Sequence, residues 1–400
     1  MQKIPQGIFN YYCQFSIVNC SLYFMNGGIF MGYCIREEVL GLERYVAGKP
    51  ISEVKRELGL TEVIKLASNE NPLGCSPKVK QALKEAIEEA CLYPDASNYE
   101  LKETIAKKLA VKSSQVFCGT GSDLLIRAIC STFISPGDES IMAEVTFSRY
   151  DAGTKLMGGK SVFVPMKNHG LDVDKMVDSI TAKTKIIWFC NPNNPTGTIF
   201  RKEDLERIIS RIPENVIFIM DEAYIEYVTD DQYPDSISLL DKYPNLIILR
   251  TFSKAYGLAS LRCGYGIANE EFTNYLNTVI GPFDVNLFAQ KAAVAALKDN
   301  EYLQLVYETN RQEKEKLYIE FKRLGLDYIE TNANFIMAAS KLDDKLVFNE
   351  LLKRGIIIRP GYLLGMPGWM RITIGTEEQN KALIKALTEI LNEQALEVAN

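Results

Sequence analysis

The stretch from residue 185 to residue 197 reads KIIWFCNPNNPTG, an apolar run followed directly by asparagine, proline and glycine. A short apolar run bounded by turn residues is typical of a strand that is buried on both faces of a sheet. Asparagine, proline and glycine favour a tight turn after such a strand. Similar apolar runs, each followed by polar residues, occupy Glu139–Ala143, Ser161–Val164, Val216–Met220, Leu246–Leu249 and Gly264–Ala268.

Helical segments alternate with these runs. Ser76-Pro77 reads as an N-cap followed by proline in the first turn of a helix. Residues 98–110 have the periodicity of a second amphipathic helix, and the segment Gly119–Ser122 leads into a third that runs to about Phe133. We therefore predict an α/β fold with a mostly parallel sheet sandwiched by helices, in which ligands bind at the carboxyl ends of the strands.

The C-terminal part has a different pattern. A long helix is predicted over residues 301–324, then short strands and a final helix, which together indicate a smaller α+β domain; the strands are Phe335–Ala338, Ile356–Arg359 and Met370–Ile374. Residues 1–30 are apolar but interrupted, and they match neither a signal peptide nor a membrane span. The predicted organisation is an atypical extension (1–30), an arm that is part of the small domain (31–75), a large domain (76–290) and the small domain (291–400).

The composition excludes several classes of protein. The chain has 400 residues and a net charge of -6, which does not suggest a nucleic-acid surface. Nine cysteines without a CxxC pair favour a reduced, cytoplasmic protein over a disulfide scaffold. His169 is the only histidine and lies in a predicted turn, so we expect neither a metal site nor a Ser-His-Asp hydrolase.

Three strand ends carry chemically useful residues. The first is the Asn191–Gly197 turn, and the second is Asp221-Glu222-Ala223-Tyr224. The third is Thr251-Phe252-Ser253-Lys254, with Arg262 eight residues beyond the lysine. This set suits pyridoxal phosphate (PLP), which needs a lysine for a Schiff base, a carboxylate at the ring nitrogen, donors on the phenolate oxygen and an anion cradle.

Each role has a candidate. Lys254 is the predicted Schiff-base lysine and Asp221 the partner of the ring nitrogen, while Asn194 and Tyr224 are donors to the phenolate oxygen. The remaining candidates hold the phosphate or cover the ring. They are Gly121, Ser122 and Asp123 at a helix N-terminus, Thr251 or Ser253 as a hydroxyl, Arg262 as a charged donor, and Phe147 on the ring face.

Taken singly, each feature has a simpler interpretation. The Asn191–Gly197 segment by itself is a turn, Asp221 a cap, Lys254 a solvated lysine and Phe147 a core residue. Their order along the chain, each after an apolar run, favours one shared site. Two weaker motifs are set aside: the Gly-x-Gly pairs at 119 and 264 lack the third glycine of a dinucleotide fingerprint, and Thr154 replaces the first glycine of a P-loop.

At this level of detail the chain resembles fold-type I PLP aminotransferases over roughly residues 40–395. The motifs that carry the resemblance are LASNENPLG (66–74), YPD (93–95), GTGSD (119–123), NPNNPTG (191–197), DEAY (221–224), RTFSKAYGL (250–258) and RITIGT (371–376). The segments around Asn69 and Arg371 are similar to those of the histidinol-phosphate aminotransferase branch, so Asn69 is added to the substrate-binding candidates.

The resemblance implies a homodimer with shared active sites. Tyr93 matches a tyrosine that reaches the cofactor phosphate of the neighbouring chain, and Tyr45, Arg359 and Arg371 match positions that hold the anionic end of the substrate. The chain departs from the family pattern in two places. Thr120 and Leu124 replace Asn and Glu near the phosphate loop, and Leu287 and Phe288 are bulkier than usual, which could alter specificity if they line the substrate entrance.

The implied activity is transamination between histidinol phosphate and 2-oxoglutarate, with glutamate as the amino donor in histidine synthesis. Two alternatives share the implied fold: an aromatic or aspartate aminotransferase, and a threonine-phosphate decarboxylase. A third is a catalytically silent binding protein of the same fold, against which the presence of Lys254, Asp221, Tyr224, Asn194 and Arg262 argues. No membrane or nucleic-acid partner is expected.

Overall fold

A computed structural model of the chain describes residues 23–25, 28–30, 35–44 and 48–399. The chain divides into two compact units, Met1–Glu43 and Arg44–Asn400. In the first unit, β1 (Tyr23–Met25) pairs antiparallel with β2 (Gly28–Phe30), and α1 spans Glu37–Leu40. Most of the predicted extension, and the candidate Tyr45, lie outside the described residues.

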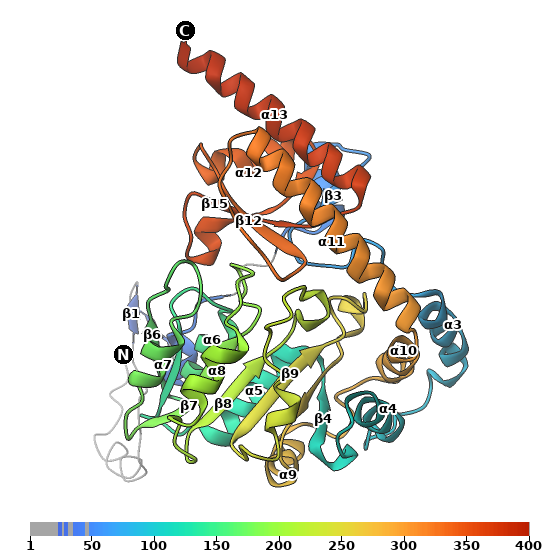
Figure 1. The fold of residues 1–400 in the computed structure, drawn as a ribbon, viewed down its shortest axis with the longest axis vertical. Helices are drawn as coiled ribbons and strands as arrows, with labels where there is room; N and C mark the ends of the chain where they lie inside the picture. The colour runs from blue at the N-terminus through green and yellow to red at the C-terminus, as the bar shows by residue number, and fades with distance from the viewer. Residues whose placement is uncertain (1–22, 26–27, 31–34, 45–47, 400) are drawn as a thin grey trace, which may run out of the picture. The chain divides into compact units, whose positions relative to one another are not determined.

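The second unit contains a seven-stranded sheet in the order β4-β10-β9-β8-β7-β5-β6 (Figure 1). Neighbouring strands from β9 to β6 are parallel, while β10 runs antiparallel to both β4 and β9. The strands are β4 (Val116–Gly119), β5 (Glu139–Ala143), β6 (Lys160–Val164), β7 (Thr184–Cys190), β8 (Ile217–Asp221), β9 (Leu246–Thr251) and β10 (Gly264–Ile267). This confirms the predicted mostly parallel sheet.

Two of the strands, β8 and β9, end later than their apolar runs predicted. The run to Met220 is followed in β8 by Asp221, and β9 continues from Leu249 to Thr251. Hydrophobicity marks where a strand is buried in apolar surroundings, whereas the hydrogen-bond ladder continues into polar residues. Asp221 and Thr251 therefore stand on the last rigid positions of neighbouring strands, not on loops.

Helices cover both faces of the sheet. On one face lie α3 (Pro77–Ala86), α4 (Tyr99–Leu109), α7 (Val173–Asp178), α8 (Lys202–Ile209) and α10 (Leu287–Leu297). On the other lie α5 (Gly121–Phe133), α6 (Arg149–Leu156) and α9 (Glu270–Val279). As predicted, Ser76 caps α3: its hydroxyl accepts the backbone N–H of Val79 at 3.2 Å.

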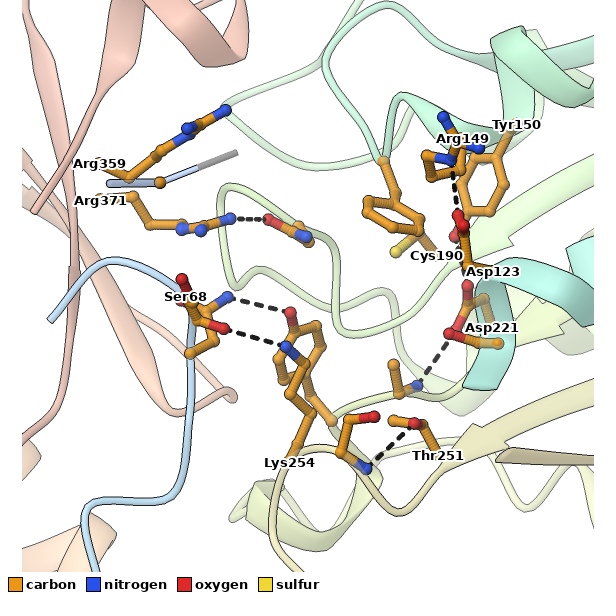
Figure 2. A pocket seen from close by; sticks show the side chains of 18 of the residues that line it. Ser68, Asp123, Arg149, Tyr150, Cys190, Asp221, Thr251, Lys254, Arg359 and Arg371 are labelled. Atoms are coloured by element: carbon orange, nitrogen blue, oxygen red, sulfur yellow. Dashed lines mark hydrogen bonds and ion pairs between the residues drawn. The ribbon is translucent and has the colours of Figure 1, made fainter. Parts of the chain in front are cut away.

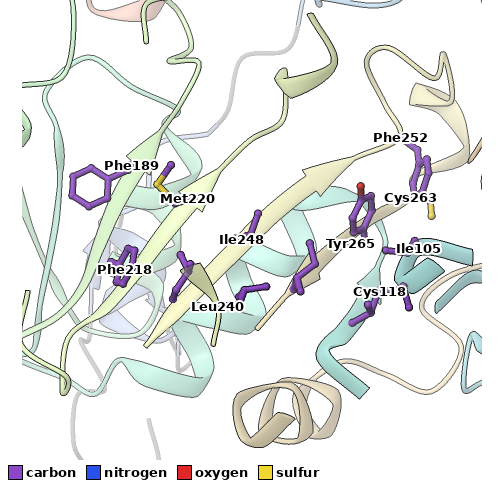
Figure 3. Close-up of a cluster of buried hydrophobic side chains, with 14 of the residues drawn as sticks. Ile105, Cys118, Phe189, Phe218, Met220, Leu240, Ile248, Phe252, Cys263 and Tyr265 are labelled. Atoms are coloured by element: carbon purple, nitrogen blue, oxygen red, sulfur yellow. The ribbon is translucent and has the colours of Figure 1, made fainter. Parts of the chain in front are cut away.

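The strand side chains alternate between two cores, as the two-residue period of a strand requires. In β7, Ile187 and Phe189 belong to the core that includes α4, α8 and α10, whereas Ile186 and Trp188 face α5 and α6. Figure 3 shows the first of these cores, with Phe189, Phe218 and Ile248 projecting from adjacent strands. Burial on both faces explains why these strands are continuous apolar runs.

A second sheet of four antiparallel strands, in the order β11-β12-β15-β14, has its own core (Figure 1). Its strands are β11 (Tyr328–Ile329), β12 (Phe335–Ala339), β14 (Arg359–Pro360) and β15 (Trp369–Thr373). Around them lie α11 (Asn300–Arg323), α12 (Asp344–Lys353) and α13 (Glu377–Ala399). A separate parallel pair joins β3 (Ile64–Lys65) to β13 (Ile356–Ile357), and α2 spans Ile51–Leu58.

The predicted single strand Ile356–Arg359 is wrong in one respect: it is two short strands in different sheets. β13 pairs with β3, and β14 pairs with β15. Ile356, Ile357 and Ile358 are all buried, so the run is apolar throughout although its two halves have different partners. Hydrophobicity alone therefore cannot show that the first half pairs with β3 and the second half with β15.

The predicted domain boundary at residue 290 falls inside α10. Buried residues on both sides of it, including Ala289 and Ala293, belong to the core of the large sheet. The change of core comes along α11 instead, since Leu317 and Phe321 pack in the core of the small sheet. Figure 1 shows α11 running from beside α10 to the small sheet. We therefore propose α11 as the C-terminal link between a large and a small domain.

Shorter 3₁₀ helices occupy Ile87–Glu89, Ser113–Gln115, Ile225–Tyr227, Ile237–Leu239, Ala259–Leu261 and Gly361–Leu364. Among the described residues, no helix is long and apolar enough to cross a membrane.

Candidate active site

A cavity of about 440 Å³ lies at the carboxyl ends of β7, β8 and β9, with residues of the small sheet in its wall (Figure 2). It brings together most of the side chains predicted from the sequence. Those that line it are Asn69, Ser122, Asp123, Phe147, Asn194, Asp221, Tyr224, Thr251, Ser253, Lys254, Arg262, Arg359 and Arg371. Gly121 directly precedes Ser122 at the start of α5. Tyr93 is not in this wall.

Lys254 follows β9 and projects into the cavity. Its Nζ donates to the backbone oxygen of Ser68 at 3.1 Å and lies 5.7 Å from the centre of the Tyr224 ring. Burial lowers the pKa of Lys254 to about 8, and the charge of Arg371 acts in the same direction. A lysine in this environment is a neutral amine, and thus a nucleophile and base, over much of the range above pH 8.

Asp221 is the buried carboxylate at the end of β8, with an exposed fraction of 3 %. Its Oδ1 accepts the backbone N–H of Ala223 at 3.2 Å, and its Oδ2 accepts the hydroxyl of Tyr150 at 2.6 Å. Burial raises the pKa of Asp221 to about 6, although both hydrogen bonds oppose this shift. A cation placed against this carboxylate would compensate for its desolvation.

Backbone geometry forms an anion cradle at the start of α5. Gly121 has a φ of 76°, and a Cβ there would lie 2.6 Å from Nη2 of Arg262. A Cβ on Gly264 would lie 2.8 Å from the backbone nitrogen of Ser122. Two glycines thus allow the N-terminus of a helix and a guanidinium to approach each other, which is the donor set that phosphate prefers.

The two hydroxyl candidates differ in their contacts. Thr251 uses its hydroxyl on the backbone of the segments next to the end of β9, since its Oγ1 accepts the N–H of Ser253 at 3.1 Å and donates to the oxygen of Cys263 at 3.4 Å. Ser253 instead accepts from Nη1 of Arg262 at 3.4 Å. We therefore favour Ser253 as the hydroxyl facing an anion and assign Thr251 to loop geometry.

Asn194 is held by Arg371 of the small sheet, and Tyr224 by Asn69, which is itself hydrogen-bonded to that sheet. Nη1 of Arg371 donates to Oδ1 of Asn194 at 2.6 Å, which leaves the Asn194 amide N–H₂ as the group available to an acceptor in the cavity. Nδ2 of Asn69 donates to the hydroxyl of Tyr224 at 3.0 Å. Asn69 itself has a φ of 56°, and its N–H donates to Oγ1 of Thr373 on β15 at 2.9 Å.

Arg359 and Arg371 stand directly opposite each other on β14 and β15. Both are buried, with exposed fractions of 6 % and 7 %, and Figure 2 shows both side chains reaching into the same cavity. Like charges opposite each other on neighbouring strands repel. An anion between them would relieve this repulsion, so the pair favours a phosphate or a carboxylate.

Sequence reasoning missed several residues of the wall. Tyr150 contacts Asp221, Arg149 forms an ion pair with Asp123 at 2.5 Å, and Cys190 ends β7. Burial raises the pKa of Cys190 to about 12, so its thiol is neutral. Arg149 and Tyr150 begin α6 soon after β5 ends. A helix start that follows a strand is the same signal that points to Ser122 at the start of α5, and it could have pointed to these two residues.

Three residues singled out from the sequence lie away from the cavity wall of their own chain. Tyr93 is exposed, and its ring stacks on Phe283 at 4.7 Å. Leu287 and Phe288 form the first turn of α10 and do not line the cavity. Leu287 and Phe288 could therefore affect specificity only without lining the cavity of their own chain.

Comparison with known proteins shows the family to which the chain belongs. The family model for "Aminotransferase class I and II" matches residues 61–387. Histidinol-phosphate aminotransferases of Caldicellulosiruptor saccharolyticus and Moorella thermoacetica are 50 % and 48 % identical to the chain, and each match covers 89 % of it. The matches cover 99 % and 92 % of those two proteins.

A solved structure supports the fold. The crystal structure of histidinol-phosphate aminotransferase from Sinorhizobium meliloti, in complex with pyridoxal-5'-phosphate, superposes with a TM-score of 0.83. It shares 24 % sequence identity and covers 91 % of this chain and 99 % of its own. The chain therefore belongs to the class I and II aminotransferases. Within that class, its sequence relatives place it in the histidinol-phosphate aminotransferase family.

Proposed function

We propose that this chain is a PLP-dependent aminotransferase that exchanges an amino group between histidinol phosphate and 2-oxoglutarate in histidine biosynthesis. The observation that carries the proposal is the position of Lys254 and Asp221 in one cavity with two buried arginines. Lysine and carboxylate suit the cofactor, and the arginine pair suits an anionic substrate.

The residues present fit PLP. A Cβ on Gly121 would collide with Arg262, and a Cβ on Gly264 would collide with the Ser122 nitrogen. Because both positions are glycine, the Ser122 N–H, Ser253 and Arg262 lie close enough together to hold one phosphate. Asp221 offers a buried carboxylate to a protonated ring nitrogen. Asn194 and Tyr224 would donate to the phenolate oxygen, and Phe147 would cover a ring face.

When bound, PLP supplies an electron sink for the bond that is broken at the amine-bearing carbon. The protein's own part is to hold and move protons. We assign the general base to the Lys254 amine, whose lowered pKa makes its neutral form far more abundant near neutral pH than that of an ordinary lysine. Arg371 binds an anionic group common to both substrates and also orients Asn194, so substrate and cofactor contacts are linked through one side chain.

The preference for a phosphate is assigned to Arg359, together with Tyr45. Losing a charge-assisted hydrogen bond typically costs about 1.5–3 kcal/mol. Arg359→Ala should therefore lower kcat/KM for histidinol phosphate by roughly 10- to 200-fold. Turnover of phenylalanine should fall much less, because phenylalanine carries no phosphate. Steady-state rates for both amines with 2-oxoglutarate test this, with the exposed Arg323→Ala of α11 as the matched control.

The outcomes distinguish the alternatives. Equal losses for both amines would show that Arg359 is structural or binds a common group. A wild-type protein that ignores histidinol phosphate but uses aromatic amino acids or aspartate would contradict the proposed substrate and leave the aminotransferase chemistry intact. Release of CO₂ from threonine phosphate would favour a decarboxylase, and absence of a visible absorbance band after PLP addition would favour a silent binding protein.

We also propose that the active protein is a homodimer with shared sites. Tyr93 has an exposed fraction of 82 %, although it belongs to a motif of the family resemblance. Other large apolar side chains are also exposed: Phe283, on which Tyr93 stacks, and, on the same stretch of chain as Tyr93, Ile87, Leu92 and Tyr99. Exposed apolar side chains in such number support a protein interface. A second copy would cover them and receive Tyr93 at its cofactor phosphate.

Hybrid dimers test this arrangement. Lys254→Ala and Tyr93→Ala subunits should each be poorly active alone, and mixing them should restore part of the activity. Each hybrid dimer then contains one site with both lesions and one intact site. The measurement is turnover after verified subunit exchange, with a mixture of Lys254→Ala and wild-type subunits as the control. No recovery in the exchanged mixture would contradict the shared site.

We propose a cytoplasmic location because the described cysteines are free thiols. Cys75, Cys91, Cys118, Cys130, Cys190 and Cys263, the cysteines in the described part of the second unit, are all free. Free thiols, half-exposed or exposed at Cys75 and Cys91, suit a reducing compartment.

A further inference from the structure

Tyr150 lines the cavity and makes the shortest hydrogen bond to Asp221. It does not belong to any of the motifs that carry the family resemblance. It lies in the first turn of α6, on the face of the sheet opposite α4 and α8. Its exposed fraction is 0 %, and its hydroxyl donates to Oδ2 of Asp221 at 2.6 Å. Figure 2 shows Tyr150 and Asp221 together on the side of the cavity away from the arginine pair.

We propose that Tyr150 is a positioning residue that holds the Asp221 carboxylate in its anionic form and in one orientation, and thereby keeps the cofactor ring nitrogen protonated. This inference rests on the proposed function, because it requires PLP in the cavity. It adds to that function a residue that acts on the cofactor through Asp221 without being assigned to contact it.

The geometry restricts Tyr150 to this task. Its ring stacks on Trp188, with centroids 4.5 Å apart and planes 11° from parallel, and it meets Phe147 edge-on at 5.7 Å. Trp188 is itself fixed by a hydrogen bond from Nε1 to Oγ of Ser140 at 2.8 Å. The phenol is thus held by aromatic packing on a rigid strand, and its hydroxyl has little freedom to leave the carboxylate.

The surrounding titratable groups make Tyr150 a dependable donor. Burial raises the pKa values of Tyr150 and Tyr224, of Cys190 on β7, and of Tyr233, so these groups are neutral at neutral pH. Glu222 follows Asp221 and pairs with Arg250 at 2.8 Å. Both hydrogen-bond donors to Asp221 are therefore neutral. The backbone N–H of Ala223 donates to Oδ1, and the Tyr150 hydroxyl donates to Oδ2.

Removing the hydroxyl has a defined consequence. A carboxylate without this donor is a stronger base, so a proton shared between Asp221 and a ring nitrogen would shift toward Asp221. The ring would then carry less positive charge, its linkage to Lys254 would retain a proton to higher pH, and the electrostatic attraction between cofactor and protein would weaken.

Tyr150→Phe tests this, because it deletes the hydroxyl and keeps the stacked ring. PLP should bind to the cofactor-stripped protein about 10- to 100-fold more weakly than to wild type, the range expected for a hydrogen bond to a charged group. The pH midpoint of the visible absorbance band should move upward. Tyr318→Phe is the matched control, since Tyr318 is also buried, stacked on Tyr328 at 4.4 Å and hydrogen-bonded, but in the small-sheet core.

An analogue separates positioning from general structural damage. In 1-deaza-PLP a carbon replaces the ring nitrogen, so Asp221 has no ring proton to hold. Wild type and Tyr150→Phe should bind this analogue with equal affinity, within a factor of about two, if Tyr150 acts through Asp221. A variant whose cavity is merely distorted would bind PLP and the analogue more weakly by the same factor, which would overturn the proposal.

A second variant covers the case in which Tyr150→Phe does not fold. Tyr150→3-fluorotyrosine keeps the shape but has a more acidic, stronger donor, and it should move the absorbance midpoint downward. An unchanged or raised midpoint would overturn the proposal. Wild type that binds no PLP would instead contradict the proposed function itself, so the two failures are distinguishable.

Discussion

Replacing Lys254 with alanine is expected to reduce turnover by several orders of magnitude while leaving PLP able to bind. The lysine is assigned both to the covalent attachment of the cofactor and to proton transfer, and no other lysine among the described residues lines the cavity. The phosphate contacts proposed for Ser122, Ser253 and Arg262 would not depend on it. Single-turnover absorbance measurements with glutamate would separate the retained binding from the lost chemistry.

Chemical mapping provides the direct control for this prediction. Borohydride reduction of the wild-type protein with PLP should place the adduct on Lys254, as identified by peptide mass. Adduct on a different lysine would contradict the assignment. A small primary amine added to Lys254→Ala should restore part of the activity, because it can supply both a base and an imine linkage. A tertiary amine of similar size can act only as a base and should restore less.

The lowered pKa of Lys254 gives the same site a pH dependence. Only the neutral amine attacks a carbonyl, and the pKa of this amine is about 8 because of burial and the charge of Arg371. Attachment of PLP to the cofactor-stripped protein should therefore accelerate as pH rises through about 8. In Arg371→Gln the removal of that positive charge should raise the midpoint, so attachment near neutral pH should be slower than in wild type.

Replacing Asp221 with alanine is the second substitution with a large expected effect. The carboxylate is buried at the end of β8, where its charge is poorly solvated and a protonated ring nitrogen would be its partner. Losing a preorganised electrostatic partner of this kind costs roughly 3 kcal/mol or more in the chemical step, about 100-fold or more in rate. Pre-steady-state turnover at saturating PLP measures that step without the effect of weaker cofactor binding.

A matched substitution tests the cause. Asp221→Asn keeps the size of the side chain and the Ala223 contact but removes the charge, so it should lose nearly as much as Asp221→Ala. Near-normal turnover of either variant with PLP bound would show that the pyridine ring lies elsewhere. Exposed Asp178→Ala, which breaks only a surface ion pair with Arg211, should leave the rate unchanged.

Local sequence was sufficient for the parts of the site that depend on one strand and the residues after it. Lys254, Asp221 and Asn194 each follow an apolar run, and parallel strands bring their carboxyl ends to one edge of a sheet. The prediction therefore needed only the pattern of the runs and the parallel arrangement. The same logic located Ser122 at a helix start.

Other features required contacts between distant parts of the chain. Tyr150 and Asp221 are 71 residues apart, and Arg371 and Asn194 are 177 apart. Neither pair leaves a periodic signal, because the distance between two such side chains depends on how helices and sheets pack. The split of residues 356–360 between β13 and β14 is of the same kind, since both partners suit an apolar strand.

By itself the sequence determined the strands of the large sheet, the helices that cover them, and which lysine and carboxylate stand at neighbouring strand ends, because burial period and turn chemistry act over a few residues. Only the tertiary structure decided that Arg359 faces Arg371, that Tyr150 donates to Asp221, and that α10 belongs to the large-sheet core. Those facts follow from strand register and from packing between elements, where one apolar surface can accept several partners and the complete chain selects one.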